Sequence, residues 1–288
     1  MHTKKDLVVS AVCGYRWEQI RPFVISLMKS GFQGEKVLFA SKMDAFALEC
    51  VTNRNFRVIQ FDIPADTTTW TFTSKERYVP LLKFLAKNRH KYNNVVWVDA
   101  SDLMFQSDPS EWLAKHVNPP MVIAARECWR IQDESTFNLP WTKAAFPDDF
   151  EWLRKQEVLC GGTVAGDAET VFRALMEVYK ITSVHPEYAD QAVLNYVLHK
   201  PFQMMPPTHI YTPSMSQGWA ATCSAFDTEG FKSIIGRPAA ELTDAVPVFD
   251  QERSLVLTPD GKTPFCIVHQ YNRAEPWVRT IPQKYQWD

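Results

Sequence analysis

Two carboxylates three residues apart, Asp99 and Asp102, follow directly after the apolar run 95–98. An apolar run without polar alternation is typical of a strand buried on both faces of a sheet. The carboxyl ends of such strands are where open α/β sheets bind their ligands. Two carboxylates this close repel each other, and a divalent cation such as Mn²⁺ or Mg²⁺ relieves the repulsion. The alternative interpretation is a helix N-cap followed by a turn aspartate.

The elements that must position these carboxylates alternate in type along the first half of the chain. The patterns predict strands over 7–12, 36–40, 56–61, 94–98 and 121–125. Between them, helices are predicted over 17–29 and 45–51, and a third begins at a Ser74 N-cap and continues through Leu85. This order indicates an α/β fold with a doubly wound, mostly parallel sheet and helices on both faces.

The second half of the chain has a less regular pattern. A short strand over 163–165 is expected after Gly161-Gly162, and Asp167 is expected to cap a helix. Another helix is predicted over 188–198. The stretch 201–264 is rich in Pro, Thr and Ser, which indicates loops and small strands. A single domain over 1–288 is therefore expected.

Composition and charge exclude several classes of function. The chain of 288 residues has a net charge of −2, and its longest basic run is the pair Lys4-Lys5, so no nucleic-acid partner is expected. The apolar stretch 7–12 is too short to span a bilayer, and we expect neither a signal peptide nor a transmembrane segment. The six cysteines are scattered without a CxxC pair, which favours reduced thiols in a cytoplasmic protein.

Three segments resemble motifs of a known class of enzymes. Asp99 to Asp102 resembles the Asp-x-Asp metal-binding signature of nucleotide-sugar glycosyltransferases of the A-type fold, with one extra residue between the carboxylates. The segment 189–195 is similar to the Asp-Gln-x-x-Leu-Asn helix start of glycosyltransferase family 8, the glycogenin and bacterial galactosyltransferase group. The turn expected at Cys160-Gly161-Gly162 lies where that family has a similar turn before a strand.

The C-terminal segment 269–277 resembles the His-x-x-Gly-x-x-Lys-Pro-Trp pattern of the same family. The histidine, proline and tryptophan are in register, whereas Asn272 and Glu275 replace the glycine and the lysine. The resemblance implies that His269 completes the metal site; imidazole suits Mn²⁺ better than Mg²⁺. A histidine hydrogen-bonded in the core is the alternative. Because Glu275 cannot replace the lysine that contacts the donor pyrophosphate, Arg273 or Arg279 would have to do so.

The loop after the first predicted strand is the candidate nucleoside pocket, formed by Ala11, Cys13, Gly14 and Tyr15. Gly14 would let the backbone approach a base or a ribose. Tyr15 could stack on uracil or be an ordinary surface tyrosine. Asp62, after the third strand, is a candidate nucleoside contact, with a turn aspartate as the alternative.

Further donor and acceptor contacts are implied by the resemblance. Arg77 corresponds to a contact to the donor phosphate or sugar; a solvated helical arginine paired with a glutamate is the alternative. Gly161 and Gly162 would let the backbone lie close to the donor sugar, or would form a tight turn. Asp190 is the candidate catalytic residue on the sugar or acceptor side, although N-capping would also explain it, and Gln191 is its neighbour.

We therefore predict a metal-dependent glycosyltransferase, of the hexosyltransferase type, that uses a UDP-sugar donor and a saccharide or other hydroxyl acceptor, with retention of configuration. Residues 1–125 would form the nucleotide-binding half, and 126–288 the acceptor half with a C-terminal closing segment. Three alternatives remain open. The first is an inverting A-type enzyme with Asp190 as base. The second is a sugar nucleotidyltransferase, for which the loop 13–17 is a poor match. The third is a carbohydrate-binding protein that stacks sugars on Trp277, Tyr285 and Trp287.

Overall fold

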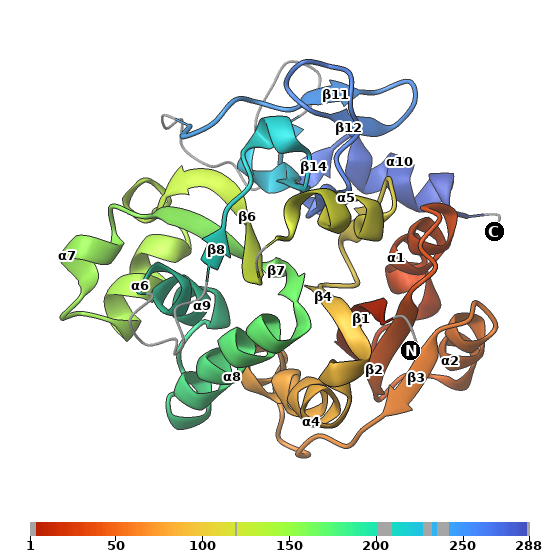
Figure 1. The fold of residues 1–288 in the computed structure, drawn as a ribbon, viewed down its shortest axis with the longest axis horizontal. Helices are drawn as coiled ribbons and strands as arrows, with labels where there is room; N and C mark the ends of the chain where they lie inside the picture. Colours follow the sequence, from red (N-terminus) through yellow and green to blue (C-terminus); the bar gives the residue numbers. More distant parts are fainter. Residues whose placement is uncertain (1–3, 119, 201–208, 227–231, 235–241, 287–288) are drawn as a thin grey trace.

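A seven-stranded mixed sheet forms the centre of the computed structural model of this protein (Figure 1). The structure describes residues 4–118, 120–200, 209–226, 232–234 and 242–286. The strand order is β3-β2-β1-β4-β7-β6-β8. The strands of this sheet are β1 (Lys5–Cys13), β2 (Glu35–Ser41), β3 (Arg57–Gln60), β4 (Tyr92–Val98), β6 (Met121–Arg130), β7 (Glu157–Asp167) and β8 (His209–Tyr211).

The expectation of a mostly parallel sheet is confirmed. Strands β3, β2, β1 and β4 run parallel to one another, and β8 runs parallel to β6. Only β7 runs antiparallel to its two neighbours, β4 and β6. The prediction of a short strand over 163–165, following Gly161-Gly162, is wrong in its length and in placing the glycines before the strand. The strand β7 has 11 residues and includes Gly161 and Gly162, because its pairing with β6 continues beyond the apolar centre to Glu157.

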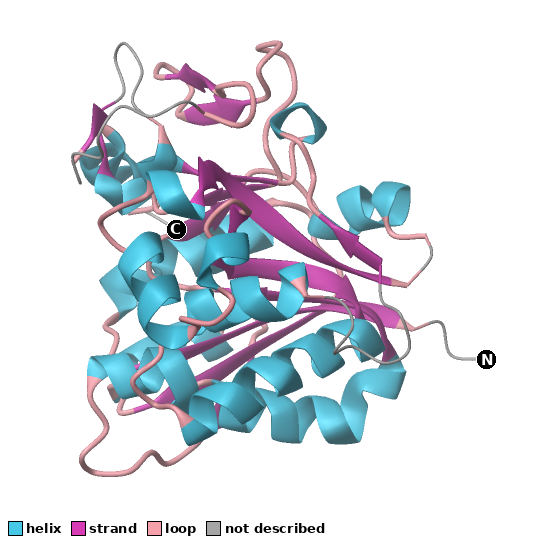
Figure 2. Cartoon of the chain, turned by 90° about the vertical axis from the view of Figure 1, so that its left-hand side faces the viewer, coloured by secondary structure: helices cyan, strands magenta, loops and turns pink. Residues whose placement is uncertain are grey.

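Helices cover both faces of the sheet (Figure 2). Alternate residues of β1 show the division: Leu7 and Val9 pack into one apolar cluster, and Val8 and Val12 pack into the other. The first cluster includes residues of α4 (Tyr78–Asn88), α8 (Ala168–Val184) and α9 (Asp190–His199). The second includes residues of α1 (Trp17–Lys29), α2 (Ala45–Thr52), α5 (Pro109–His116) and α10 (Trp277–Lys284). The smaller helices are α3 (Thr69–Thr71), α6 (Asn138–Ala145) and α7 (Phe150–Leu153).

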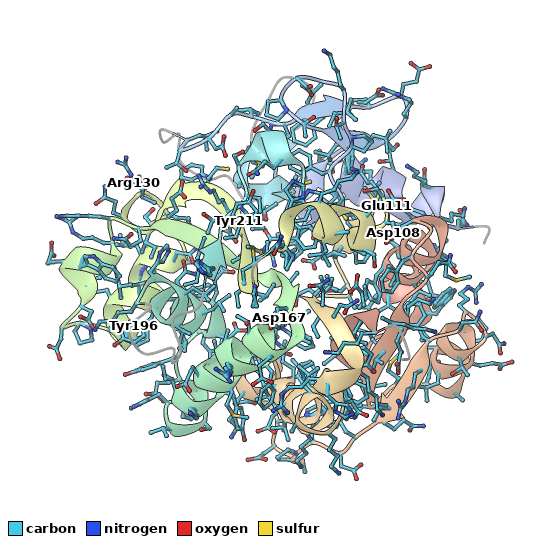
Figure 3. The ribbon with its side chains drawn as sticks, viewed as in Figure 1. Asp108, Glu111, Arg130, Asp167, Tyr196 and Tyr211 are labelled. Atoms are coloured by element: carbon cyan, nitrogen blue, oxygen red, sulfur yellow. The ribbon has the colours of Figure 1, made fainter. Side chains whose placement is uncertain are left out.

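Several helices begin at a side-chain cap, and one of the caps predicted from the sequence is absent. Asp167 caps α8 through Thr170 N–H, as predicted, and Asp108 caps α5 through Ser110 N–H (Figure 3). Ser74 does not cap α4. It is buried within a π-helical turn, Phe72–Glu76, that joins α3 to α4. Such turns are frequent at functional sites.

A small second sheet brings the C-terminal part of the chain to the end of β4. It consists of β5 (Leu103–Phe105), β13 (Ile267–His269) and β9 (Ala220–Thr222). His269 lies opposite Leu103 in this sheet. Two further two-stranded ribbons are formed by β11 (Val248–Asp250) with β12 (Leu255–Leu257) and by β10 (Lys232–Ser233) with β14 (Ala274–Glu275). None of the helices in the described part of the chain is long and apolar enough to cross a membrane.

The side chain of Asn195, on α9, pairs with the backbone of β7 beyond the point where β7 pairs with β4. The β4–β7 ladder ends at the pair Val98–Thr163. Beyond it, the Leu159 N–H donates to Asn195 Oδ1, and Asn195 Nδ2 donates to Leu159 O, both at 2.8 Å. The side chain of Asn195 is buried. It therefore replaces a missing strand neighbour and holds α9 against the sheet.

We predict that Asn195→Ala lowers the free energy of unfolding by about 3 kcal/mol, because it leaves a buried N–H and a buried C=O without partners. Urea-induced unfolding followed by circular dichroism would measure this change. An unchanged unfolding midpoint with an unchanged slope would contradict the role assigned to Asn195.

Candidate active site

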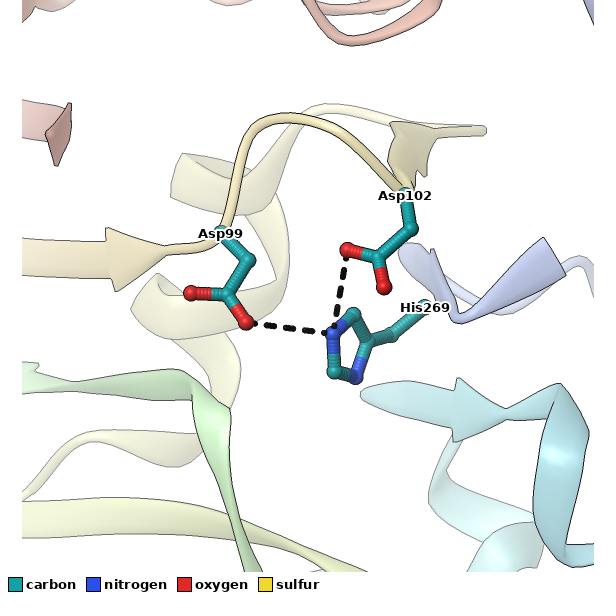
Figure 4. A group of neighbouring side chains, drawn as sticks. All are labelled: Asp99, Asp102 and His269. Atoms are coloured by element: carbon teal, nitrogen blue, oxygen red, sulfur yellow. Dashed lines mark ion pairs between the residues drawn. The ribbon is translucent and has the colours of Figure 1, made fainter. Parts of the chain in front are cut away.

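Asp99, Asp102 and His269 meet at the carboxyl end of β4 (Figure 4). Asp99 follows β4, Asp102 immediately precedes β5, and His269 ends β13. His269 Nε2 lies 3.5 Å from Asp99 Oδ2 and 3.5 Å from Asp102 Oδ1. Neither aspartate caps a helix, so the capping alternative is wrong. The structure therefore brings all three predicted ligands together.

The surroundings of His269 fit a cation-binding role better than a core role. Its ring is 2 % exposed, and its Nδ1 lies 3.2 Å from Cys160 Sγ, while Nε2 faces the two carboxylates. Nε2 is buried and makes no hydrogen bond to the residues that the structure describes. Burial lowers the pKa of His269, but Cys160 and the carboxylates of Asp102 and Asp99 outweigh it and hold this pKa well above its ordinary value. A cation entering here would displace a proton.

The three ligand atoms also fit a divalent cation in their spacing and type. They all lie within 4.8 Å of one another. A cation bound about 2.1 Å from each ligand separates neighbouring ligand atoms by roughly 3 Å, so a small inward movement closes the site. Two carboxylate oxygens and one imidazole nitrogen form a set that Mn²⁺ accepts readily.

Gly162 leaves the space in which the three ligands meet. A Cβ at this position would lie 2.6 Å from Asp99 Oδ2 and 2.6 Å from His269 Cε1. A Cβ at Gly161 would meet only Gln191, at 3.7 Å or more. Both glycines lie inside β7, so the alternative of a tight turn is wrong. Close approach explains the glycine at 162.

We predict that Gly162→Ala weakens Mn²⁺ binding about tenfold or more, because the new methyl group pushes Asp99 and His269 apart. Gly161→Ala is the matched control, with an affinity like that of the parent. Calorimetric titration with Mn²⁺ measures both. Equal affinities of the two variants would contradict the close-approach explanation.

Arg77 is buried between two carboxylates. Its Nη1 lies 2.6 Å from Asp99 Oδ1, its Nη2 lies 2.5 Å from Asp190 Oδ2, and the residue is 7 % exposed. The alternative of a solvated arginine paired with a glutamate is therefore wrong. Burial raises the pKa of Asp99, but the charge of Arg77 together with His269 outweighs burial and holds this pKa well below its ordinary range.

Asp190 is the first residue of α9, and its side chain does not cap that helix. It accepts hydrogen bonds from Arg77 and, at 2.9 Å, from the hydroxyl of Tyr78. Burial of that hydroxyl, followed by the charge of Asp190, raises the pKa of Tyr78 well above its ordinary value. The N-capping interpretation of Asp190 is therefore wrong: its side chain forms an ion pair with Arg77 at the cavity.

Gln191 belongs to a network that the sequence did not indicate. Its Oε1 accepts from Gly161 N–H at 3.1 Å, and its Nε2 donates to Glu127 Oε1 at 3.2 Å and to Asn138 Oδ1 at 2.9 Å. Glu127 and Asn138 are both buried. Glu127 was missed because the strand was predicted only over 121–125, whereas β6 continues to Arg130. No sequence pattern indicated the position of Asn138.

A cavity of about 160 Å³ unites these groups. Its lining contains predicted site residues, namely Arg77, Asp99, Gly161, Gly162, Asp190, Gln191, His269 and Arg273. It also contains residues that were not predicted, namely Thr73, Glu127, Phe137, Asn138, Trp141 and Gln270. Positive charge, carboxylates, amides and aromatic rings thus converge on one space.

Arg273 and Arg279, the two candidates for the missing lysine, lie in different environments. Arg273 lines the cavity, with Nη2 3.9 Å from Asp102 Oδ2. The side chain of Arg279 is 78 % exposed and pairs with Glu275 at 3.2 Å on the surface of the C-terminal segment. Only Arg273 is therefore placed to meet an anion at the metal ligands.

None of the predicted nucleoside residues lines this cavity. Ala11 and Cys13 lie in the final part of β1, and Gly14 follows with a left-handed φ of 68°. Burial raises the pKa of Tyr15, and the nearby carboxylates of Asp99 and Asp102 act in the same direction. Asp62 is exposed and lines a separate groove between β3 and α4.

The aromatic platform expected for a carbohydrate-binding protein does not exist as proposed. Trp277 is fully buried and Tyr285 is 5 % exposed, because α10 packs its apolar side into the core. Trp287 lies outside the described residues.

Solved structures share this fold. The galactosyltransferase LgtC in complex with donor and acceptor sugar analogues matches with a TM-score of 0.55 and 10 % identity, over 97 % of this chain and 94 % of LgtC. An active-site mutant of LgtC matches with a TM-score of 0.57, 11 % identity and the same coverage. The bifunctional glycosyltransferase WbbM, in its apo form, matches with a TM-score of 0.52 and 12 % identity, over 77 % of this chain and 40 % of WbbM.

No protein-family model matches the sequence, and no curated protein sequence is significantly similar to it. The chain thus has the A-type glycosyltransferase fold, as expected, in one α/β unit. Membership of family 8 stays a prediction.

Proposed function

We propose that this protein is a metal-dependent glycosyltransferase that transfers a sugar from a UDP-sugar to a hydroxyl group of a saccharide or other acceptor. The observation that carries the proposal is a cavity lined by Asp99, His269, Arg273 and the Asp190–Gln191 segment, with Asp102 grouped with Asp99 and His269 as a third possible cation ligand. The fold shared with LgtC, whose structure contains donor and acceptor sugar analogues, supports the same reaction class.

Different residues of the site would bind the diphosphate and the uridine of such a donor. Asp99, Asp102 and His269 would hold Mn²⁺ or Mg²⁺, which neutralises the charge developing on a leaving diphosphate. Arg273 adds a positive charge at the same end of the cavity. The loop after β1, with Ala11, Cys13, Gly14 and Tyr15, would hold the uridine. Asp62 is a weaker candidate, since it faces a different groove. Residues 1–125 would thus supply most of the nucleotide side, and 126–288 the acceptor side together with the C-terminal closing segment that carries His269 and Arg273.

Asp190, Gln191, Gly161 and Gly162 would surround the transferred sugar. Asp190 Oδ2 is held by both Arg77 and Tyr78, which suits a fixed contact to a sugar or its reaction centre. We propose a retaining reaction, as the resemblance to glycosyltransferase family 8 implies. The anomeric configuration of the first-formed product, measured by NMR, separates retention from an inverting reaction in which Asp190 acts as base.

We predict that UDP at a hundred times its dissociation constant, with Mn²⁺, stabilises the parent by about 2.7 kcal/mol and does so more effectively than GDP or CDP at equal concentration. Asp102→Asn should weaken this Mn²⁺-dependent UDP binding by about two orders of magnitude, because it removes one ligand charge. Asp108→Asn is the control, since asparagine caps a helix as well as aspartate does. Thermal-shift and calorimetric titrations measure these effects.

Unchanged UDP affinity in Asp102→Asn would reject the metal assignment. A larger stabilisation by GDP than by UDP would reject the uridine assignment and leave the metal site standing.

Arg273→Ala is predicted to weaken UDP binding about tenfold, because a partly exposed cation near a diphosphate contributes roughly 1.4 kcal/mol. Arg279→Ala should bind UDP as the parent does, since its guanidinium faces Glu275 and solvent. Isothermal titration of UDP with saturating Mn²⁺ compares the two variants. Equal losses of UDP affinity in both variants would contradict a direct contact of Arg273 with the diphosphate, since they would indicate an effect of the total charge.

A further inference from the structure

Three aromatic side chains, Trp70, Phe137 and Trp141, form one wall that leads into the cavity; we call them the aromatic wall. Phe137 and Trp141 line the cavity. Their ring centroids are 5.3 Å apart, and the ring of Trp70 meets that of Trp141 edge to face at 6.1 Å. Trp70 is 40 % exposed, and Phe137 and Trp141 are half-buried. The wall thus extends from the cavity to the surface.

The aromatic wall lies on the opposite side of the metal ligands from the first-strand loop. In the sheet, β1 is the neighbour of β4 on one side, and β7 followed by β6 lies on the other. Asp99 follows β4, and the expected nucleoside loop follows β1. Phe137 and Trp141 come from the segment after β6, whose Glu127 shares the cavity with them. The wall therefore lies where the sugar end of a donor would meet its acceptor.

Local structure holds the wall in place before any ligand binds. The buried carboxylate of Glu134 accepts the N–H groups of Thr136, Phe137 and Asn138, the last at 2.6 Å. These bonds fix the start of α6, which carries Trp141. On the other side, Trp70 Nε1 donates to Pro186 O at 3.2 Å. Fixed rings lose little conformational freedom when a ligand stacks on them.

Polar groups beside the wall match a ligand that has an apolar face and hydroxyl edges. Glu127 and Asn138 line the same cavity, one as a carboxylate acceptor and the other as an amide. The axial C–H groups of a pyranose ring form an apolar and weakly positive face, which complements the negative face of an aromatic ring. Aromatic walls with a few placed polar groups are typical of specific small-ligand sites.

We propose that the aromatic wall is a saccharide subsite in which a pyranose ring of the acceptor stacks on Trp141, with Trp70 extending the contact toward the surface. This assignment of the acceptor as a saccharide rests on the proposed function. The donor sugar, attached to a diphosphate at the metal ligands, occupies the inner part of the cavity near Gly162 and Asp190. The acceptor reaches it from the surface along the wall.

The test titrates lactose, maltose and cellobiose into the protein with saturating UDP and Mn²⁺, followed by calorimetry and saturation-transfer NMR. At least one disaccharide should bind the parent, and Trp141→Ala should weaken that binding about tenfold. Trp141→Phe should retain most of the affinity, and Trp70→Ala should lose part of it. Trp152→Ala is the control, because Trp152 is 43 % exposed on α7, outside the cavity lining. UDP affinity should be the same in all variants.

The proposal is overturned if none of the disaccharides binds the parent, or if Trp141→Ala and Trp70→Ala bind them as the parent does. It is also overturned if Trp141→Ala loses UDP affinity to the same extent as saccharide affinity, since the wall would then serve the nucleotide. Failure of the proposed function has a different signature. The parent would not bind UDP with Mn²⁺, while Trp141-dependent saccharide binding would persist.

Discussion

One buried cation, Arg77, connects three of the segments that surround the cavity. Its guanidinium contacts Asp99 after β4 and Asp190 at the start of α9, and its backbone ends the π-helical turn before α4. The same group lies over the ring of Trp97, 5.5 Å from the centroid. Removing one partner of a buried ion pair leaves a charge without compensation, which typically costs about 3 to 5 kcal/mol. The end of the sheet, α4 and α9 therefore cannot move independently.

The direction of β7 helps to form the space in which the three predicted metal ligands meet. Because β7 runs antiparallel between β4 and β6, its backbone passes beside Asp99, whose N–H donates to Gly162 O. The missing side chain at Gly162 leaves room for the His269 ring, which arrives from β13. Two segments far apart in the sequence thus share one small space, and the charge of Arg77 limits the repulsion among the carboxylates there.

The two sides of the cavity carry chemically different groups. Asp99, His269 and Arg273 lie near β4 and the small second sheet, whereas Phe137, Asn138 and Trp141 come from α6 and the residue before it. A nucleotide sugar has the same division, with an anionic diphosphate at one end and a neutral ring at the other. This correspondence connects the proposed reaction with the proposed saccharide subsite, since each uses the part of the cavity whose chemistry matches it.

Local sequence patterns were sufficient for α1, for the start of α8 at Asp167 and for the carboxylates at the end of β4, because hydrophobic periodicity and capping act over a few residues. The resemblance placed His269 with those carboxylates. Tertiary structure alone decided the direction and length of β7, the burial of Arg77, and the positions of Arg273 at the cavity and Arg279 at the surface. It also decided which side chains of α6 face the cavity. Each of these depends on contacts between segments that are distant in the sequence. Strand pairing, the pairing of a buried charge and the exposure of an aromatic ring to a cavity all require such contacts.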